Sequence, residues 1–127
     1  MENERKGSQQ GVARIVKATR YSWQGFKASW QTEAAFREEA LLAAVLLPLA
    51  VWLDVTTVER VLLIAAVLLV LVVELINSAL EAVVDRVGLQ HHALSGKAKD
   101  AGSAAVFTTL TIAIFTWVLI VGERYFW

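Results

Sequence analysis

The chain of 127 residues has no cysteine, a single proline and only two histidines. Without cysteine, neither a disulfide framework nor a thiolate metal site is possible. The P-loop, G-x-G-x-x-G and G-x-S-x-G patterns are also absent, which excludes the soluble nucleotide-binding architectures built on such motifs. Apolar residues, in contrast, make up 57% of the chain, more than an average soluble domain contains. The composition therefore favours one small membrane domain.

Three apolar runs are long enough to cross a bilayer. They cover about residues 34–53, 58–84 and 103–121, and roughly 20 apolar residues span the hydrocarbon core. The sequence therefore predicts an all-α membrane protein with three transmembrane helices. Pro48, inside the first run, predicts a kink or a locally freed carbonyl. Because three short spans have little interior of their own, we also expect the protein to form oligomers.

The connections between these runs are polar. Asp54 or Thr57 is expected to cap the second helix, and residues 88–102 are expected to form a loop before the third. The polar start of the chain is not followed by a short apolar core with a small-residue cleavage site, so we expect no cleaved signal peptide. The whole chain, residues 1–127, is interpreted as a single domain.

The segment from about residue 12 to residue 32 predicts an amphipathic surface helix. One stripe carries apolar side chains, among them Trp23 and Trp30, and the other side carries basic ones such as Arg14. A basic helix with tryptophans on its apolar face suits the lipid interface. The alternative is a soluble helix that packs on a partner. Gly25 is a candidate break within this helix.

The distribution of cations predicts the orientation in the membrane. Ten of the twelve Lys and Arg residues lie in the first forty positions or in residues 86–102, whereas the 54–60 turn and the C-terminus carry one Arg each. Loops rich in Lys and Arg stay in the cytoplasm. The N-terminus and the second loop are therefore expected to be cytoplasmic.

Five polar residues form a stripe on the second apolar run. They are Glu74, Asn77, Ser78, Glu81 and Asp85, and at about 100° per residue they fall within an arc of roughly 100°. A charged carboxylate near the middle of a bilayer costs about 2.5–3.5 kcal/mol on insertion scales. The stripe therefore requires a compensating partner, a water-filled crevice or a functional role.

The depths of these carboxylates predict different roles. Glu33, before the first run, and Glu81 lie at the same cytoplasmic level and can share a hard cation such as Mg²⁺ with substrate phosphates. Glu74 lies deeper between apolar neighbours, which suits it to accept a proton. Cations for a polyphosphate are available from Arg14, Lys97 and Lys99.

Other roles for the same residues stay open from the pattern alone. Glu74 and Asn77 also suit hydrogen bonding between helices, and Glu81 and Asp85 suit a solvated helix end. His91 and His92 are expected at the surface. A membrane enzyme and a small proton-coupled transporter explain the stripe equally well, and a non-catalytic assembly partner is a third class.

Four segments carry a resemblance to a known family. They are YSWQGFKASW, EAAFREE, VELINSALEAVVDR and LSGKAKDAGSAAV, and with them the chain resembles the prokaryotic diacylglycerol kinases from about Ala13 to the third apolar run. The resemblance implies a surface helix, three transmembrane helices and a homotrimer in a bacterial cytoplasmic membrane, with active sites shared between subunits. It also implies transfer of the γ-phosphoryl group of MgATP to diacylglycerol, which gives phosphatidic acid. Related Gram-positive proteins phosphorylate undecaprenol, which is the alternative substrate.

The resemblance further implies a role for individual residues. Glu74 corresponds to the base that takes the proton of the lipid hydroxyl, with Asn77 beside it, while Glu33 and Glu81 correspond to the carboxylates that hold Mg²⁺. The implied ATP-binding residues are Arg14, Tyr21, Glu33, Glu81, Asp85, Gln90, His91, His92, Lys99 and Asp100. The implied lipid-substrate residues are Arg14, Ser22, Trp23, Trp30, Glu39, Glu74 and Ser103.

Overall fold

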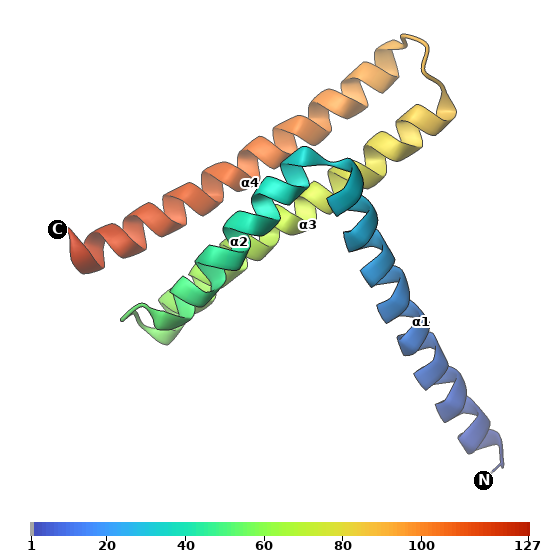
Figure 1. Ribbon diagram of the computed structural model, residues 1–127, viewed down its shortest axis with the longest axis horizontal. Helices are drawn as coiled ribbons and strands as arrows, with labels where there is room; N and C mark the ends of the chain where they lie inside the picture. Colours follow the sequence, from blue (N-terminus) through green and yellow to red (C-terminus); the bar gives the residue numbers. More distant parts are fainter. Residues whose placement is uncertain (1) are drawn as a thin grey trace. The chain divides into compact units, whose positions relative to one another are not determined.

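The computed structural model describes the backbone of residues 2–127, and the side chains of residue 7 and of residues 9–127. The described chain forms four helices and no strand: α1 (Glu2–Thr32), α2 (Ala34–Trp52), α3 (Thr57–Val87) and α4 (Ala93–Tyr125) (Figure 1). This confirms the predicted all-α class. The chain divides into two compact units, residues 1–32 and residues 33–127.

The first unit is the single helix α1. It already begins at Glu2, earlier than the predicted boundary at residue 12, and it continues through Gly25 without a break. One glycine costs a helix about 1 kcal/mol relative to alanine, which a long helix tolerates. Within this chain the apolar stripe stays exposed, with Val16 61% and Trp23 69% accessible. Exposed apolar side chains such as Val16 and Trp23 are expected of a helix that lies on lipid.

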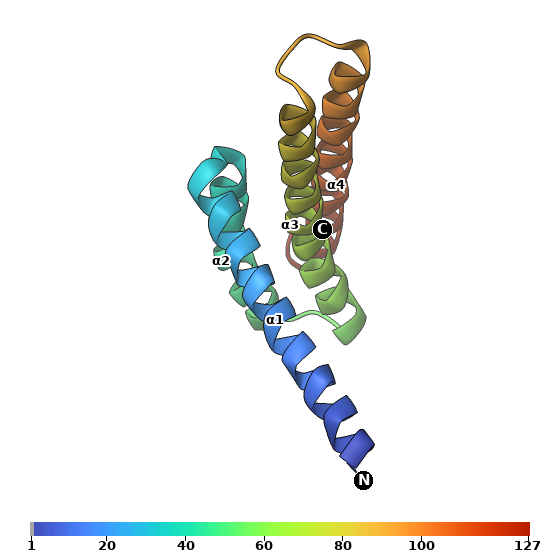
Figure 2. The ribbon, with the colours of Figure 1, turned by 90° about the vertical axis from the view of Figure 1, so that its right-hand side faces the viewer.

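In the second unit α3 is the central helix. It contacts both α2 and α4, whereas the backbones of α2 and α4 do not approach each other in the described chain. Figure 2 shows α3 and α4 side by side, joined by a short loop. The polar stripe therefore lies on the helix that touches both of the others.

One cluster of the small buried core lies near the turn between α2 and α3, and Phe36, Val67 and Val70 are buried further along these helices. Ala50, Leu53 and Leu63 are buried near the turn, and Trp117 from α4 packs against them. The Trp117 indole N–H donates to the Leu63 carbonyl at 3.2 Å, so the ring is fixed by one polar contact as well as by packing. Few other large side chains are covered. Phe107 and Phe115 on α4 remain 72% and 65% exposed.

The cap of α3 differs from the prediction. Thr56, rather than Asp54 or Thr57, is the N-cap residue. Its Oγ1 accepts from Glu59 N at 3.2 Å, and Glu59 Oε1 accepts from Thr56 N at 3.1 Å. A capping box needs Ser or Thr three residues before Glu or Gln. Thr56 and Glu59 meet this requirement, so the signal was present in the sequence. At the predicted kink, Pro48 lies inside α2, which extends to Trp52.

The second loop is shorter than predicted. Only residues 88–92 connect α3 to α4, because α4 begins at Ala93 and not near residue 103. His92 is the N-cap residue, and its Nδ1 accepts from Leu94 N at 3.0 Å. The alternating alanines and lysines that follow are good helix formers. Consequently Lys99 and Asp100 lie on a helix whose direction fixes their spacing.

Two helices, α3 and α4, are long and apolar enough to cross a membrane. The helix α2 has only 19 residues and carries Arg37, Glu38 and Glu39 near its start. It therefore matches the composition of a span less well than α3 or α4. The three-span arrangement stays a prediction.

Candidate functional site

The centre of the candidate site is Glu74, in the middle of α3. Its side chain is only 6% exposed. The carboxylates of Glu39 on α2, of Glu33 just before α2 and of Glu81 on α3 itself lie near enough to repel its charge. Several like charges around a buried carboxylate are unfavourable unless a proton or a cation compensates them. The structure thus brings together four of the predicted site residues at one place.

Glu33 reaches this cluster because of its position at the start of α2. It is the N-cap residue of α2, but its side chain does not cap that helix. Instead Glu33 Oε1 accepts a hydrogen bond from Ser78 Oγ on α3 at 3.0 Å. Ser78 was recognised as part of the polar stripe but not as a site residue. A hydrogen bond of this kind fixes the orientation of a carboxylate.

Asn77 lies one turn along α3 from Glu74. Its Nδ2 donates to Glu81 Oε1 over a long 3.5 Å, whereas its Oδ1 is buried without a hydrogen-bond partner. The oxygen faces Gly102 on α4, where an added Cβ would lie only 2.0 Å away. An unsatisfied buried acceptor costs about 1–3 kcal/mol. In the described chain, Asn77 thus hydrogen-bonds only within α3 and not to another helix.

A polar pocket lies at the cytoplasmic end predicted for α3 and α4. Its volume is about 210 Å³, and five residues of the predicted ATP-binding set line it: Asp85, Gln90, His91, His92 and Lys99. Lys99 Nζ donates to Asp85 Oδ1 at 2.8 Å. This hydrogen bond and the charge of Asp85 raise the pKa of Lys99 above its ordinary value. The lysine, which precedes the predicted span at residues 103–121, therefore stays cationic at neutral pH.

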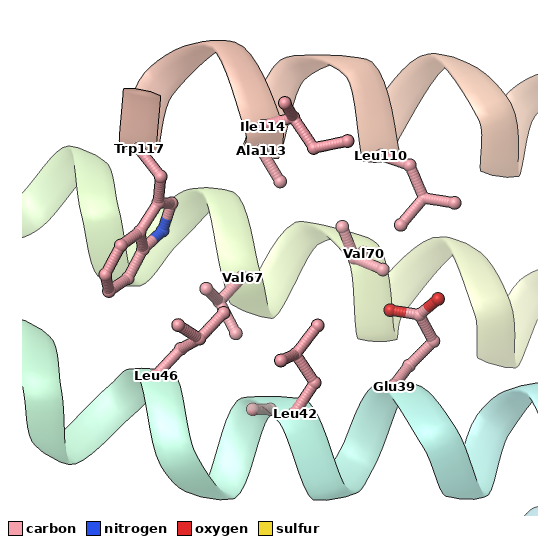
Figure 3. Close-up of a pocket in the computed structure, with 10 residues that line it drawn as sticks. Glu39, Leu42, Leu46, Val67, Val70, Leu110, Ala113, Ile114 and Trp117 are labelled. Atoms are coloured by element: carbon pink, nitrogen blue, oxygen red, sulfur yellow. The ribbon is translucent and has the colours of Figure 1, made fainter. Parts of the chain in front are cut away.

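An apolar cavity of about 240 Å³ lies between α2, α3 and α4 (Figure 3). Leu42 and Leu46 line it from α2, Val67 and Val70 from α3, and Leu110 and Ile114 from α4. Figure 3 shows the Glu39 carboxylate at one end of the cavity and Trp117 at the other. The cavity thus joins the carboxylate cluster to apolar walls that suit a hydrocarbon chain.

The remaining predicted site residues lie on α1 and α4. Those on α1 are Arg14, Tyr21, Ser22, Trp23 and Trp30. Tyr21 carries the guanidinium of Arg20 over its ring, 5.7 Å from the centroid, a contact that the sequence did not indicate. Ser22 Oγ donates to the Ala18 carbonyl at 2.9 Å. On α4, Asp100 and Ser103 are exposed.

The donor set fits a magnesium ion that also binds ATP. In the part of the chain that the structure describes, no three His, Cys, Asp or Glu side chains form a metal site by themselves. Magnesium usually takes one or two protein carboxylates and completes its coordination with water and phosphate oxygens. Glu33, oriented by Ser78, and Glu81, beside Asn77, are carboxylates of this kind.

Comparison with known proteins gives the family. The family model described as prokaryotic diacylglycerol kinase matches residues 20–121. The chain belongs to the prokaryotic diacylglycerol kinase family. The matched residues contain every predicted site residue except Arg14.

Individual relatives agree over nearly their whole length. The diacylglycerol kinase of Escherichia coli K12 is 50% identical over 115 residues, which cover 91% of this chain and 94% of the relative. That of Pseudomonas aeruginosa is 55% identical over 112 residues, covering 88% and 91%. That of Helicobacter pylori strain 26695 is 42% identical over 113 residues, covering 89% and 85%. The family resemblance of the sequence is therefore confirmed.

Proposed function

We propose that this member of the family is an ATP-dependent diacylglycerol kinase in which Glu74 is the general base. The observation that carries the proposal is the burial of Glu74 among three other carboxylates. In the reaction the lipid hydroxyl oxygen attacks the γ-phosphorus of ATP, the bond to the bridging oxygen breaks, and ADP leaves. Glu74 takes the hydroxyl proton, and the product is phosphatidic acid.

Asn77 acts beside Glu74 on the same face of α3. Its nitrogen faces Glu81, one helical turn further on, so its amide contacts the proposed metal-holding carboxylate. Phosphoryl transfer depends mainly on positioning and on charge neutralisation. A fixed row of Glu74, Asn77 and Glu81 supplies the positioning.

Glu33 and Glu81 hold Mg²⁺ together with the phosphates of ATP. The ion, when bound, neutralises charge on the transferred phosphoryl group. Ser78 orients Glu33 through its 3.0 Å hydrogen bond. Both carboxylates also lie near enough to Glu74 to act on its charge, and a cation shared by Glu33 and Glu81 would offset this accumulation of negative charge.

The nucleotide occupies the polar pocket at the loop between α3 and α4. Lys99 and Asp85 already pair across this pocket, so Lys99 is held where a phosphate would need it. Gln90, His91 and His92 contact the nucleotide from the loop, and Asp100 from the first turns of α4. Arg14 and Tyr21 complete the set from α1.

The lipid places its hydroxyl beside Glu74 and its hydrocarbon in the apolar cavity that ends at Glu39. Ser103 contacts the polar head of the lipid, and Arg14, Ser22, Trp23 and Trp30 contact it from the surface helix. The exposed aromatic side chains of α1 support this role, because tryptophans favour the boundary between headgroups and acyl chains.

The protein spans the cytoplasmic membrane of a bacterium three times, through residues 34–53, 58–84 and 103–121, with its N-terminus in the cytoplasm. Residues 12–32 lie on the membrane surface, and the whole chain forms one domain. It assembles as a homotrimer with sites shared between subunits. The large apolar side chains that remain exposed on α3 and α4 support burial against lipid or neighbouring subunits.

Label transfer in vesicles tests the proposed function. Purified protein is mixed with γ-labelled ATP, Mg²⁺ and vesicles that contain either diacylglycerol or undecaprenol. We expect label in phosphatidic acid and none in undecaprenyl phosphate. Label in undecaprenyl phosphate alone would assign the chain to the alternative substrate, and label in neither lipid would reject the kinase function. Omission of Mg²⁺ is the matched control and should abolish transfer.

A further inference from the structure

Gly102 on α4 lies against Asn77, a member of the polar stripe on α3. It is one of only three buried residues on α4 in the described chain. A Cβ built on Gly102 would lie 2.0 Å from Asn77 Oδ1 and 3.2 Å from Asn77 Cγ. The carboxamide of Asn77 therefore occupies the space that any other residue at position 102 would fill.

The absent side chain at position 102 leaves room for the carboxamide in one orientation. Because the nitrogen donates to Glu81 Oε1, the oxygen is turned toward Gly102, where it has no hydrogen-bond donor. A glycine Cα–H is a weak donor that occurs at close helix contacts. It accommodates the oxygen and leaves the stronger donor for the site.

A side chain at position 102 would clash with the side chain of Asn77, which can move. Only atoms of the Asn77 side chain lie within 4 Å of the added Cβ, and an asparagine side chain can rotate away about its own torsions. A methyl group at position 102 is therefore expected to leave the packing of α3 on α4 intact and to displace the carboxamide. The substitution is therefore expected to disturb the candidate site and not the fold.

We propose that Gly102 is a positioning residue of the kinase site, which acts by holding the Asn77 carboxamide with its nitrogen toward Glu81. This inference rests on the proposed function, because it assigns Gly102 a role through Asn77. Its effect should appear in kcat and not in the affinity for diacylglycerol, because no lipid contact is removed.

A double-mutant cycle tests the proposal in the full-length protein. Gly102→Ala is made in the wild-type and in the Asn77→Ala background, and kcat, KM for ATP, KM for diacylglycerol and the unfolding midpoint are measured. We expect kcat to fall about 10–100-fold in the wild-type background, since a displacement of about 1 Å can cost that much. In the Asn77→Ala background the same change should alter kcat by less than about twofold, because the displaced group is gone. KM for diacylglycerol and the midpoint should change little.

Gly25→Ala is the matched control. Gly25 also lies within a helix, but a Cβ added there meets no atom within 4 Å. It is expected to leave kcat unchanged, which shows that a methyl group on a helical glycine is not harmful in itself.

Several outcomes would overturn the proposal. An unchanged kcat in Gly102→Ala would do so, as would an equal loss in both backgrounds, because Gly102 would then act independently of Asn77. If Gly102→Ala fails to fold while the double variant folds, the role of Gly102 is structural. If Asn77→Ala alone retains full kcat, the positioning role fails while the kinase function stands. Absence of label transfer by the wild type would instead reject the function itself.

Discussion

The polar groups along the α3 helix differ in how completely they are hydrogen-bonded within the chain. At the end near the α2–α3 turn, Arg60 donates to the carbonyls of Ala50, Val51 and Val55. In the same region Arg124 binds both the backbone carbonyl and the carboxylate of Asp54. Polar groups at this end are paired within the chain itself.

From the middle of α3 toward its other end, two buried polar groups lack such partners. Glu74 is buried beside carboxylates that repel it, and Asn77 Oδ1 has no hydrogen-bond partner. The chain therefore pairs its polar groups near the α2–α3 turn but leaves Glu74 and Asn77 incompletely paired. We propose that ligands complete the structure there, because unpaired buried groups often mark functional sites. Changes at the two ends should therefore separate stability from catalysis.

The largest effect is expected from Glu74→Gln. The amide is nearly the same size but cannot accept the proton, so we expect kcat to fall about 10²–10⁴-fold, the usual contribution of a general base. The unfolding midpoint should stay the same or rise, because one of several repelling charges is removed. Initial rates with labelled ATP and an SDS titration of folded protein measure the two quantities.

Glu123→Gln, at the exposed C-terminal end of α4, is the matched control and should leave both quantities unchanged. A Glu74→Gln variant with substantial residual kinase activity would contradict the assignment of the base.

Ser78→Ala tests how far the site depends on the orientation of Glu33. The variant removes the 3.0 Å hydrogen bond to Glu33 Oε1, and loss of such an outer contact weakens metal binding about 10–100-fold. We expect the Mg²⁺ concentration for half-maximal rate to rise by about tenfold. Thr108→Ala removes a hydroxyl that bonds only its own helix and is the control. Equal Mg²⁺ dependence in the two variants would show that Ser78 does not act through Glu33.

Arg60→Met tests the paired end. Hydrogen bonds to charged groups contribute about 1.5–3 kcal/mol, so the free energy of unfolding should fall by about this amount. The rate per folded enzyme should not change, because Arg60 lies in the first turn of α3, far along the helix from Glu74 and Glu81. Arg124→Leu removes a more exposed contact and should lower the unfolding midpoint less. A loss of kcat in folded Arg60→Met protein would contradict the separation of the two ends.

Lys99→Met should have the smallest effect on stability. The pair with Asp85 is about half exposed, and exposed ion pairs contribute little. Because the pKa of Lys99 is raised in the folded chain, the pair contributes below the ordinary lysine pKa and is lost only as the pH rises through the raised value. The difference in unfolding midpoint between wild type and variant should thus be constant from about pH 6 to about pH 9. A difference that disappears within this range would show that another group titrates.

Helical periodicity was sufficient to predict α3 and its polar face. Glu74, Asn77, Ser78, Glu81 and Asp85 all lie on one continuous helix, as their spacing indicated. Boundaries were less secure. The start of α4 was placed about ten residues too late, because a run of glycine, serine and charged residues was interpreted as a loop although its alanines and lysines favour helix.

Pairings between helices could not be predicted from the sequence. The bond from Ser78 to Glu33 joins residues 45 positions apart, and the contact of Asn77 with Gly102 depends on how α3 packs against α4. Periodicity gives the face of a helix but not its rotation or its shift along a neighbour. A single sequence also does not indicate at which glycine a side chain would clash with a neighbouring helix.

The sequence by itself determined that the chain is helical and apolar, that carboxylates line one face of α3, and which family the chain resembles. These properties follow from composition and from a repeat of 3.6 residues, which are local. The tertiary structure alone decided which residues of α2 and α4 meet that face. Helix packing sets the axial shift and rotation of one helix against another, and in this chain that packing brings Glu33 to Ser78 and Gly102 to Asn77.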